Sequence, residues 1–493
     1  MTKLSAWKMA GAVFTLSAAT AITSPAQIFT SLVNFDFANG ADPMHVTLVQ
    51  GHNGNLFGTT EAGGHGDGSL GTVFEISPGS KLTTLYNFGS DSGALPQAGL
   101  LLGTDGNFYG TTYGGGMGNC IGGGSACGTV FKVTPSGGLT TLHDFCAQEG
   151  QCGDGQYPYA SLIQATDGNF YGTTNEGGGT GEGGFGTVFR ITSGGVLATI
   201  HSFHGSDGSN PLSPVIQGSN GYLYGTTPIG GDRTCPGNNG EGCGVVFTIG
   251  PKGQFTALHI FEFTDGAGPQ ALIQASDGNF YGVTAAGGDD TNCDNGCGTV
   301  FKMSPDGKII TLHTFNSTDG ANPQGTLLQA TDGNLYGTTI QGGNPVCNSG
   351  YQGCGTIFRI MPNGAFATVH NFDGTDGSTP IGGLAQATNG ILYGTTEAMG
   401  AGNWGTLFSL DVGLDPFVTF VRFAGRVGQT GPILGQGFTG TTSVAINGIP
   451  GVFTVISDTF IKATVPEGAT TGYVTVTTPS GTLTSNVPFR VIP

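Results

Sequence analysis

The 493-residue chain has few charged residues, few basic ones and no long apolar stretch after its first residues. Only 9% of residues are charged, with 14 Lys and Arg against 32 Asp and Glu, a net charge of −18. Nucleic acids and anionic membranes are bound through positive faces, so this balance argues against both partners and permits cations or neutral ligands. We expect a monomer with no membrane span in the mature chain.

Enzyme signatures are missing as well. The chain has no GxSxG, HExxH or P-loop pattern, so we predict no catalytic residues, no bound cofactor and no enzymatic activity. Trp404 is the only tryptophan after residue 26. A platform for stacking sugars would therefore have to be built from tyrosines.

The first 26 residues read as a signal peptide. Lys3 and Lys8 provide a positive start, an apolar segment follows, and small residues up to Ala26 suit cleavage before Gln27. The mature protein is then expected outside the cytoplasm, in the periplasm, at the cell surface or in the medium. A retained N-terminal anchor is the alternative.

Ten cysteines fall into five close pairs. In an exported chain this spacing predicts local disulfides. Zinc is the alternative, but no pair has a second pair or a histidine cluster at suitable spacing. The predicted disulfides are Cys120–Cys127, Cys146–Cys152, Cys235–Cys243, Cys293–Cys297 and Cys347–Cys354.

Glycine is abundant, and much of it lies in a repeated pattern. A four-residue pattern occurs seven times, 52 to 62 residues apart: an aromatic residue, then Gly, then Thr or Val, then Thr. One copy lies in ASDGNFYGVTAAGG at 275–288. Each copy is followed by a GTVF-like tetrapeptide, and an apolar segment ending in Phe also occurs seven times. The copies begin at Phe57, Tyr109, Tyr171, Tyr224, Tyr281, Tyr336 and Tyr393.

Each repeat predicts four short strands. In one copy these are 271–275, 280–285, 298–303 and 309–315, with tight Asp-Gly turns after the first and third. Four-stranded units at a period near 50 residues indicate a β-propeller. We predict an all-β chain in which residues 27–412 form a seven-bladed propeller and 413–493 a small immunoglobulin-like β-sandwich.

The order of the signatures predicts how the ring closes. One segment ending in Phe, LVNF at 32–35, precedes the first repeat, and none follows the last GTLF at 405–408. The strand near 30–36 should therefore complete the seventh blade as its outermost strand and remove an open sheet edge.

The connections divide between two faces of the disc. The turns from first to second and from third to fourth strand share one side, the turn face, and the longer connections share the other, the loop face. Variable loops on a rigid scaffold commonly carry binding sites, so we predict that a ligand binds on the loop face near the channel mouth. That face should receive the cysteine pairs and the acidic residues Glu61, Glu176, Glu182, Asp232, Asp289, Asp290, Asp294 and Glu397.

Two repeated side chains are predicted to be structural. Histidines on the fourth strands lie on different blades, too far apart to share one metal ion, and should be packed or hydrogen-bonded. Aspartates in the fourth-to-first loops should cap turns. The residues are His143, His201, His259, His313 and His370, and Asp154, Asp207, Asp265, Asp319 and Asp376.

One loop that occurs once is a calcium candidate. Asp289, Asp290, Asn292 and Asp294 place oxygen ligands close together. The pattern departs from an EF-hand because Cys293 interrupts it, and a solvated acidic loop is the alternative.

The repeats resemble the tandem GloVer repeats of secreted bacterial proteins, which carry a DGNxYGTT-type core followed by GTVF. The resemblance covers nearly all of 30–410 and implies an extracellular propeller-like protein without lending any chemistry. The tail resembles an IPT/TIG module at 435–438, 447–448, 457–459, 465–466 and 478–481, which implies a spacer or binding accessory.

These observations predict a secreted binding protein whose partner is a glycan or another extracellular molecule. The alternatives are a glycoside-cleaving propeller, which would need two carboxylates in a central pocket, and a kelch-like copper oxidoreductase, which would need a Tyr/His cluster there.

Overall fold

The computed structural model describes residues 27–65, 69–77, 79–118, 120, 126–147, 152–179, 184–232, 234–235, 240–288, 293–345, 347 and 353–492. The predicted signal peptide lies outside these residues. In the described part the chain is all-β apart from the 3-10 turn η1 (Ser90–Ser92), which confirms the predicted class. No helix among those residues is long and apolar enough to cross a membrane.

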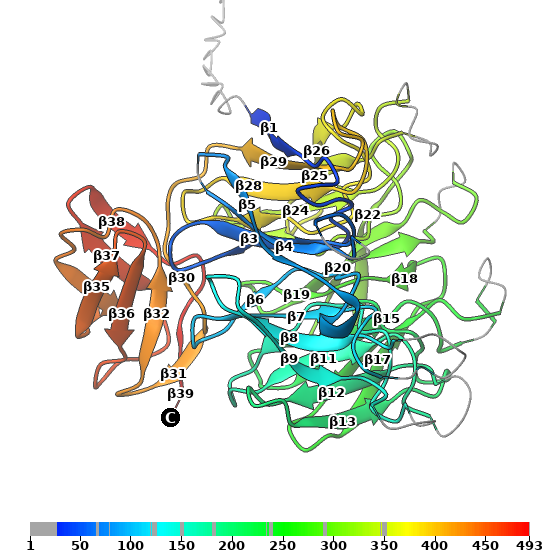
Figure 1. The fold of residues 1–493 in the computed structure, drawn as a ribbon, viewed down its shortest axis with the longest axis horizontal. Coiled ribbons are helices and arrows are strands. Elements are labelled where there is room, and N and C mark those ends of the chain that lie inside the picture. The colour runs from blue at the N-terminus through cyan, green and yellow to red at the C-terminus, as the bar shows by residue number, and fades with distance from the viewer. Residues whose placement is uncertain are drawn as a thin grey trace, which may run out of the picture.

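The repeats form seven antiparallel sheets, named sheets 1 to 7 in chain order (Figure 1). The first strands are β2 (Val49–Gln50), β6 (Leu101–Leu102), β10 (Ile163–Gln164), β14 (Ile216–Gln217), β19 (Ile273–Gln274), β23 (Leu328–Gln329) and β27 (Ala385–Gln386). The second strands are β3 (Leu56–Thr60), β7 (Phe108–Thr112), β11 (Phe170–Thr174), β15 (Leu223–Thr227), β20 (Phe280–Ala286), β24 (Leu335–Thr339) and β28 (Leu392–Thr396).

The third strands, which hold the GTVF-like segments, lie next to them. They are β4 (Thr72–Ile76), β8 (Thr129–Val133), β12 (Thr187–Ile191), β16 (Val245–Ile249), β21 (Thr299–Met303), β25 (Thr356–Ile360) and β29 (Thr406–Asp411). The outer strands are β5 (Leu82–Asn87), β9 (Leu139–Asp144), β13 (Leu197–Ser202), β17 (Phe255–Ile260), β22 (Ile309–Thr314) and β26 (Phe366–Asn371), and a short extra strand, β18 (Ala267–Pro269), pairs with β20.

In sheet 7 the outer position is taken by the first strand of the chain. β1 (Ile28–Asn34) pairs antiparallel with β29, from Ile28 opposite Asp411 to Asn34 opposite Thr406. The sheet order is β1-β29-β28-β27. Residues from the two ends of the repeat array thus share one sheet.

The repeated threonines explain much of the motif. The first Thr after the glycine donates to a carbonyl of the next sheet, at 2.7–3.4 Å, in six of the seven sheets. In sheet 5 this residue is Val283. The second Thr is hydrogen-bonded at 2.8–2.9 Å to the Thr that begins the third strand, again in six sheets. The motif therefore ties each sheet to itself and to its neighbour.

Sheet 4 breaks the second pattern, because the partner of Thr227 is Val245. The buried Thr227 hydroxyl has no hydrogen-bond partner. A buried polar group without a partner costs about 1–3 kcal/mol. We expect Val245→Thr to raise the free energy of unfolding by about 1 kcal/mol in denaturant titrations, because it restores the threonine pair.

The control is Thr227→Val, which removes the unpaired hydroxyl and should also stabilise sheet 4. If Val245→Thr lowers the stability while Thr227→Val leaves it unchanged, the unpaired hydroxyl carries no cost.

A second set of bonds joins neighbouring sheets at the turn face. A glutamine that ends the first strand accepts, through its side-chain oxygen, a backbone N–H of the preceding sheet at 2.7–3.0 Å. Six of the seven junctions have this bond, including that from sheet 7 to sheet 1, where Thr388 donates to Gln50. The fold is propeller-like: the sheets follow one another around an axis, and the last contacts the first.

The tail forms two four-stranded sheets and a short parallel pair. One sheet has the order β30 (Thr419–Phe420), β32 (Thr430–Leu434), β36 (Phe460–Thr464), β35 (Phe453–Ser457). The other has the order β34 (Ile449–Pro450), β33 (Ser443–Ile446), β37 (Val474–Thr478), β38 (Gly481–Thr484), and β31 (Ala424–Arg426) pairs with β39 (Arg490–Ile492). Both sheets contribute to one apolar core, so this C-terminal sandwich has its own interior.

The sandwich packs on the turn face, at the left of Figure 1. Thr459 donates to the carbonyl of His52 at 2.7 Å, and the His52 ring stacks on Phe460 with centroids 4.1 Å apart. Arg422 and Arg490 donate to the carbonyls of Thr166 and Ser219 in sheets 3 and 4. One face of the propeller is therefore partly covered by this domain.

The sandwich also packs against the one junction that lacks the glutamine. Sheet 2 has Leu102 in the place of the glutamine, and Leu102 shares an apolar cluster with Phe57, Leu434 and Phe460. Burial of apolar surface against the sandwich replaces the missing hydrogen bond.

Candidate functional site

A central cavity of about 310 Å³ runs between the sheets. All seven repeats contribute to its wall, through the segments that lead into or form the first strands. In repeats 1, 3, 5 and 6 the wall residue nearest the fourth-to-first loop is His45, Tyr159, Gln270 and Gln324, respectively. Most of the other wall residues are apolar or glycine. The cavity thus combines a polar end with an apolar body.

A ring of unusual backbone conformations surrounds the polar end. The residue before the proline of each fourth-to-first loop has a positive φ of 52–66° in all seven repeats. Six of these residues are not glycine, and side chains rarely adopt this conformation. They are Asp42, Leu95, Tyr157, Asn210, Gly268, Asn322 and Thr379.

A second ring is formed by the residues that follow the second threonine of each motif. In five sheets the backbone N–H of this residue donates to the carbonyl of the residue before the proline, as from Glu61 to Asp42 and from Tyr113 to Leu95. The second ring consists of Glu61, Tyr113, Asn175, Pro228, Ala285, Ile340 and Glu397. We call the two rings, with Glu176, Gln97, Tyr159 and His45 beside them, the channel mouth.

The channel mouth is chemically one-sided. Sheets 7, 1, 2 and 3 place acidic and aromatic residues in the second ring or next to it, whereas sheets 4 to 6 place Pro228, Ala285 and Ile340 there. The rings of Tyr113 and Tyr157 stack with centroids 4.9 Å apart and planes 19° apart, and Tyr159 meets Tyr113 edge-on. A flat molecule would thus find aromatic surface on one side only.

Three carboxylates of this mouth interact with one another. Burial and the neighbouring Glu61 raise the pKa of Asp42 to about 6. Burial also raises the pKa of Glu61, although the Gln97 amide, which donates to it at 2.8 Å, opposes the shift. Burial and the charges of Asp42 and Glu61 raise the pKa of Glu397. The carboxylates therefore lie close enough to repel one another.

Tyr159 and His45 meet across the cavity from sheets 3 and 1. The Tyr159 oxygen lies 3.1 Å from Nε2 of His45. Burial lowers the pKa of His45 to about 4, so the imidazole is neutral at neutral pH. Burial, followed by the charges of Glu61 and Glu397, raises the pKa of Tyr159. This pair is a neutral hydrogen-bonding group at the floor of the channel mouth.

The repeated histidines and aspartates turn out to be partners. Nε2 of each histidine lies 2.7–3.1 Å from its loop aspartate, in the pairs His143–Asp154, His201–Asp207, His259–Asp265, His313–Asp319 and His370–Asp376. The aspartates also accept backbone N–H groups, for example from His204 to Asp207 at 2.8 Å. The predicted structural roles of both sets are confirmed.

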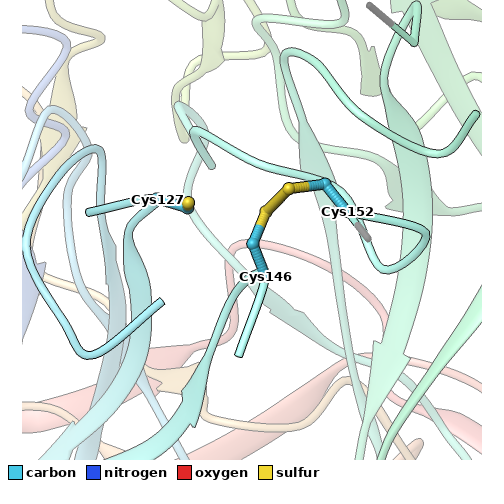
Figure 2. Close-up of side chains that lie close together, drawn as sticks. All are labelled: Cys127, Cys146 and Cys152. Carbon is cyan, nitrogen blue, oxygen red and sulfur yellow. A yellow bond between two sulfur atoms is a disulfide. The ribbon is translucent and has the colours of Figure 1, made fainter. Parts of the chain in front are cut away.

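The cysteines pair in the structure as the sequence analysis pairs them. Figure 2 shows Cys127 beside the Cys146–Cys152 disulfide. The three sulfur atoms lie within 4.8 Å of one another, the only such group of potential metal ligands among the described residues. Cys127 is itself bonded to Cys120, so this group is a pair of neighbouring disulfides. Several disulfides are consistent with an extracellular protein.

The calcium prediction stays a prediction. Asp289, Asp290 and Asn292 lie outside the described residues, as does Glu182, while Asp294 is described and exposed. Of the other acidic residues expected on the loop face, Glu61, Glu176 and Glu397 are at the channel mouth and Asp232 is exposed. Asp42, His45, Gln97 and Tyr159 were not singled out from the sequence.

Comparison with protein families identifies the repeats. The model of the Gloeobacter/Verrucomicrobia repeat matches residues 1–238 and 233–449. The chain belongs to this family, which confirms the resemblance read from the DGNxYGTT and GTVF segments. No curated protein matches the chain.

Comparison with solved structures finds similar proteins at low identity. A catalytically inactive virginiamycin B lyase from Staphylococcus aureus, solved with quinupristin, is 14% identical with a TM-score of 0.52, over 78% of this chain and 99% of the lyase. A luciferin-regenerating enzyme is 12% identical with a TM-score of 0.39, over 80% and 98%. A gluconolactonase from Xanthomonas campestris is 14% identical with a TM-score of 0.33, over 57% and 78%. At such identity the lyase supports the propeller-like fold alone.

Proposed function

We propose that this chain is an extracellular binding protein that holds a glycan at the channel mouth. Its scaffold is then a seven-bladed propeller in which β1 completes the seventh blade, with an IPT/TIG-like domain on the turn face. The observation that carries the proposal is the pair of stacked tyrosines, Tyr113 and Tyr157, beside carboxylate and amide side chains over a central cavity.

The chemistry of the mouth suits sugars. Aromatic rings stack on the C–H faces of a sugar, and carboxylates and amides bond its hydroxyl groups. Gln97 and Gln156 bond Glu61 and Glu176 at 2.8 and 3.0 Å, which orients both carboxylates. The docked sandwich leaves the loop face as the open side, which supports binding there.

The test is a glycan array followed by calorimetry with the best ligand. We expect Tyr113→Ala and Tyr157→Ala to weaken binding about tenfold or more, because each removes stacking surface. Tyr222→Ala is the matched control: Tyr222 is exposed on the turn face, and its loss should leave binding unchanged. If no glycan binds, or if all three variants bind equally well, the proposal is wrong.

A second candidate, glycoside cleavage, has one observation in its favour. The raised pKa of Asp42 beside Glu61 resembles the pairing of a protonated and an ionised carboxyl group in such enzymes. Release of reducing ends from the bound glycan, abolished by Asp42→Asn, would favour it. The Tyr159–His45 pair alone gives little support to a copper oxidase, because it offers one histidine.

A further inference from the structure

The acidic residues of the channel mouth have no cationic partner in the described part of the chain. Among those residues, the single ion pair of a lysine or arginine with a carboxylate joins Lys302 to Asp277 on the turn face. The described lysines and arginines of the repeats lie on third strands or in third-to-fourth turns, and are Lys81, Lys132, Arg190, Lys252, Lys302, Lys308 and Arg359. Among the described residues of the repeats, the basic groups therefore lie away from the loop face, and the acidic groups of that face give it a negative potential.

The side-chain oxygen of a buried amide at the mouth also lacks a hydrogen-bond partner. Gln97 is only 9% exposed, and its Nε2 donates to Glu61 Oε1 at 2.8 Å. Its oxygen, Oε1, is buried and accepts no hydrogen bond. The amide lies against the carboxylate, so the unpaired acceptor is at the acidic cluster. The group that would satisfy both is an N–H donor with a positive charge.

The spacing favours a ligand larger than a bare ion. Calcium ligands lie 2.3–2.6 Å from the metal, which brings their oxygens close together. Within the described residues, Asp42, Glu61 and Glu397 do not form a group whose oxygens all lie within 4.8 Å. A protonated amine on a larger molecule can reach separated carboxylates through several N–H groups. Aromatic faces such as that of the Tyr113–Tyr157 stack also attract cations.

We propose that the channel mouth selects a glycan that carries free amino groups. Asp42, Glu61, Glu397 and the Gln97 oxygen receive the ammonium, and Tyr113 and Tyr157 stack on the sugar. This inference rests on the proposed function and adds to it the charge of the ligand.

The test compares two oligosaccharides that differ only in charge. A tetramer of glucosamine and a tetramer of N-acetylglucosamine are titrated into the full mature chain. The pH is kept at about 6.5, above the pKa of about 6 of Asp42, so that this carboxyl group is largely ionised. We expect the amine tetramer to bind at least tenfold more tightly, with an affinity that falls as salt is added.

Isosteric variants assign the effect to residues. Asp42→Asn and Glu397→Gln should each weaken binding of the amine tetramer about tenfold and binding of the acetylated tetramer much less, because the introduced amides still bond hydroxyl groups but carry no charge. Both should keep or raise the melting temperature, because they remove repulsion. Asp232→Asn, an exposed acid of the loop face away from the mouth, is the control and should bind as the parent does.

Two outcomes overturn the inference and can be told apart. If both tetramers bind equally well, or if the acid variants weaken binding of both equally, the site does not distinguish a charged from a neutral glycan. The proposal of glycan binding is not affected by this outcome. Absence of binding for both tetramers and for the glycan array removes the proposed function together with the inference.

Discussion

A chain that lacks residues 27–37 should lose most of the stability of its propeller. The deletion removes β1, which pairs with β29 from Ile28 to Asn34, and it also removes Phe35, which is fully buried. It exposes the backbone of β29 as an open edge. We expect the melting temperature in calorimetry to fall by more than about 10 °C, or the chain to be recovered as aggregate.

Phe29 explains why this strand is equivalent to an outer strand. Its ring stacks on His370 with centroids 3.9 Å apart, as Phe255 does on His201 at 4.0 Å and Phe366 on His313 at 3.8 Å. β1 therefore makes the contact with sheet 6 that β17 and β26 make with the sheets before them.

Two point variants separate this role from a general effect of truncation. Phe29→Ala should cost about 2–3 kcal/mol, since it removes a packed aromatic ring. Ile28→Ser, at the neighbouring position that is 58% exposed, should stay within about 0.5 kcal/mol of the parent. A deletion variant with an unchanged melting temperature would show that the ring does not depend on β1.

Much of the fold could be predicted because the chain contains seven copies of one unit. Comparison of the copies separates constant from variable positions without any second sequence. The constant threonines and glycines proved to be structural, as did the histidines and aspartates, although their pairing was missed. His201 and Asp207 were assigned separate roles, yet they lie six residues apart across one strand end and bond at 3.0 Å.

Only part of the candidate site could be predicted, namely the loop face near the channel mouth with Glu61, Glu176 and Glu397, because the residues of the site vary between copies. The positions before the proline and after the second threonine hold Asp42 and Glu61 in one repeat and Gly268 and Ala285 in another. A position that varies between constant neighbours is one at which the fold does not require a particular side chain, so the side chain there can serve binding. The contact between Tyr159 of sheet 3 and His45 of sheet 1 could not be read from the sequence, in which they are 114 residues apart.

Docking of the C-terminal sandwich left a trace in the sequence that was also overlooked. Six repeats end the first strand with glutamine, and the second repeat ends it with Leu102. An apolar residue in place of a repeated polar one indicates a contact that the other copies do not make. The exception at Leu102 is enough to predict that the turn face is the side covered by another part of the chain. The residues that cover it, including Leu434 and Phe460, could be identified only from the structure.

The glycines of one sheet should form a graded series of alanine substitutions. Gly194, in the last turn of sheet 3, has no contact closer than 3.8 Å at the position of an added Cβ, so Gly194→Ala should be neutral within about 0.5 kcal/mol. Gly168 has a φ of +87° and open space, so Gly168→Ala should cost about 1–2 kcal/mol through backbone strain alone. These two variants set the scale.

Gly186 and Gly172 should cost more, for two different reasons. At Gly186, φ is +92° and an added Cβ would lie 2.4 Å from the Thr174 carbonyl oxygen and 2.7 Å from Cδ of Pro211 in the next repeat. Gly186→Ala should therefore destabilise the propeller by more than about 3 kcal/mol, because strain and a backbone clash combine. No side-chain substitution can relieve a clash with a carbonyl group.

At Gly172 the obstacle is a side chain, so the cost should be reversible. An added Cβ would lie 2.6 Å from Cζ of Phe189, the aromatic residue of the following GTVF segment, and 2.8 Å from Cδ2 of Leu162. Gly172→Ala should cost about 2–3 kcal/mol by overpacking. Combined with Phe189→Leu, it should cost less than the sum of the two single variants, by about 1 kcal/mol or more in a double-mutant cycle. The cycle, measured by denaturant unfolding, tests why YGTT and GTVF occur together, and additive costs would mean that the glycine and the phenylalanine recur for unrelated reasons.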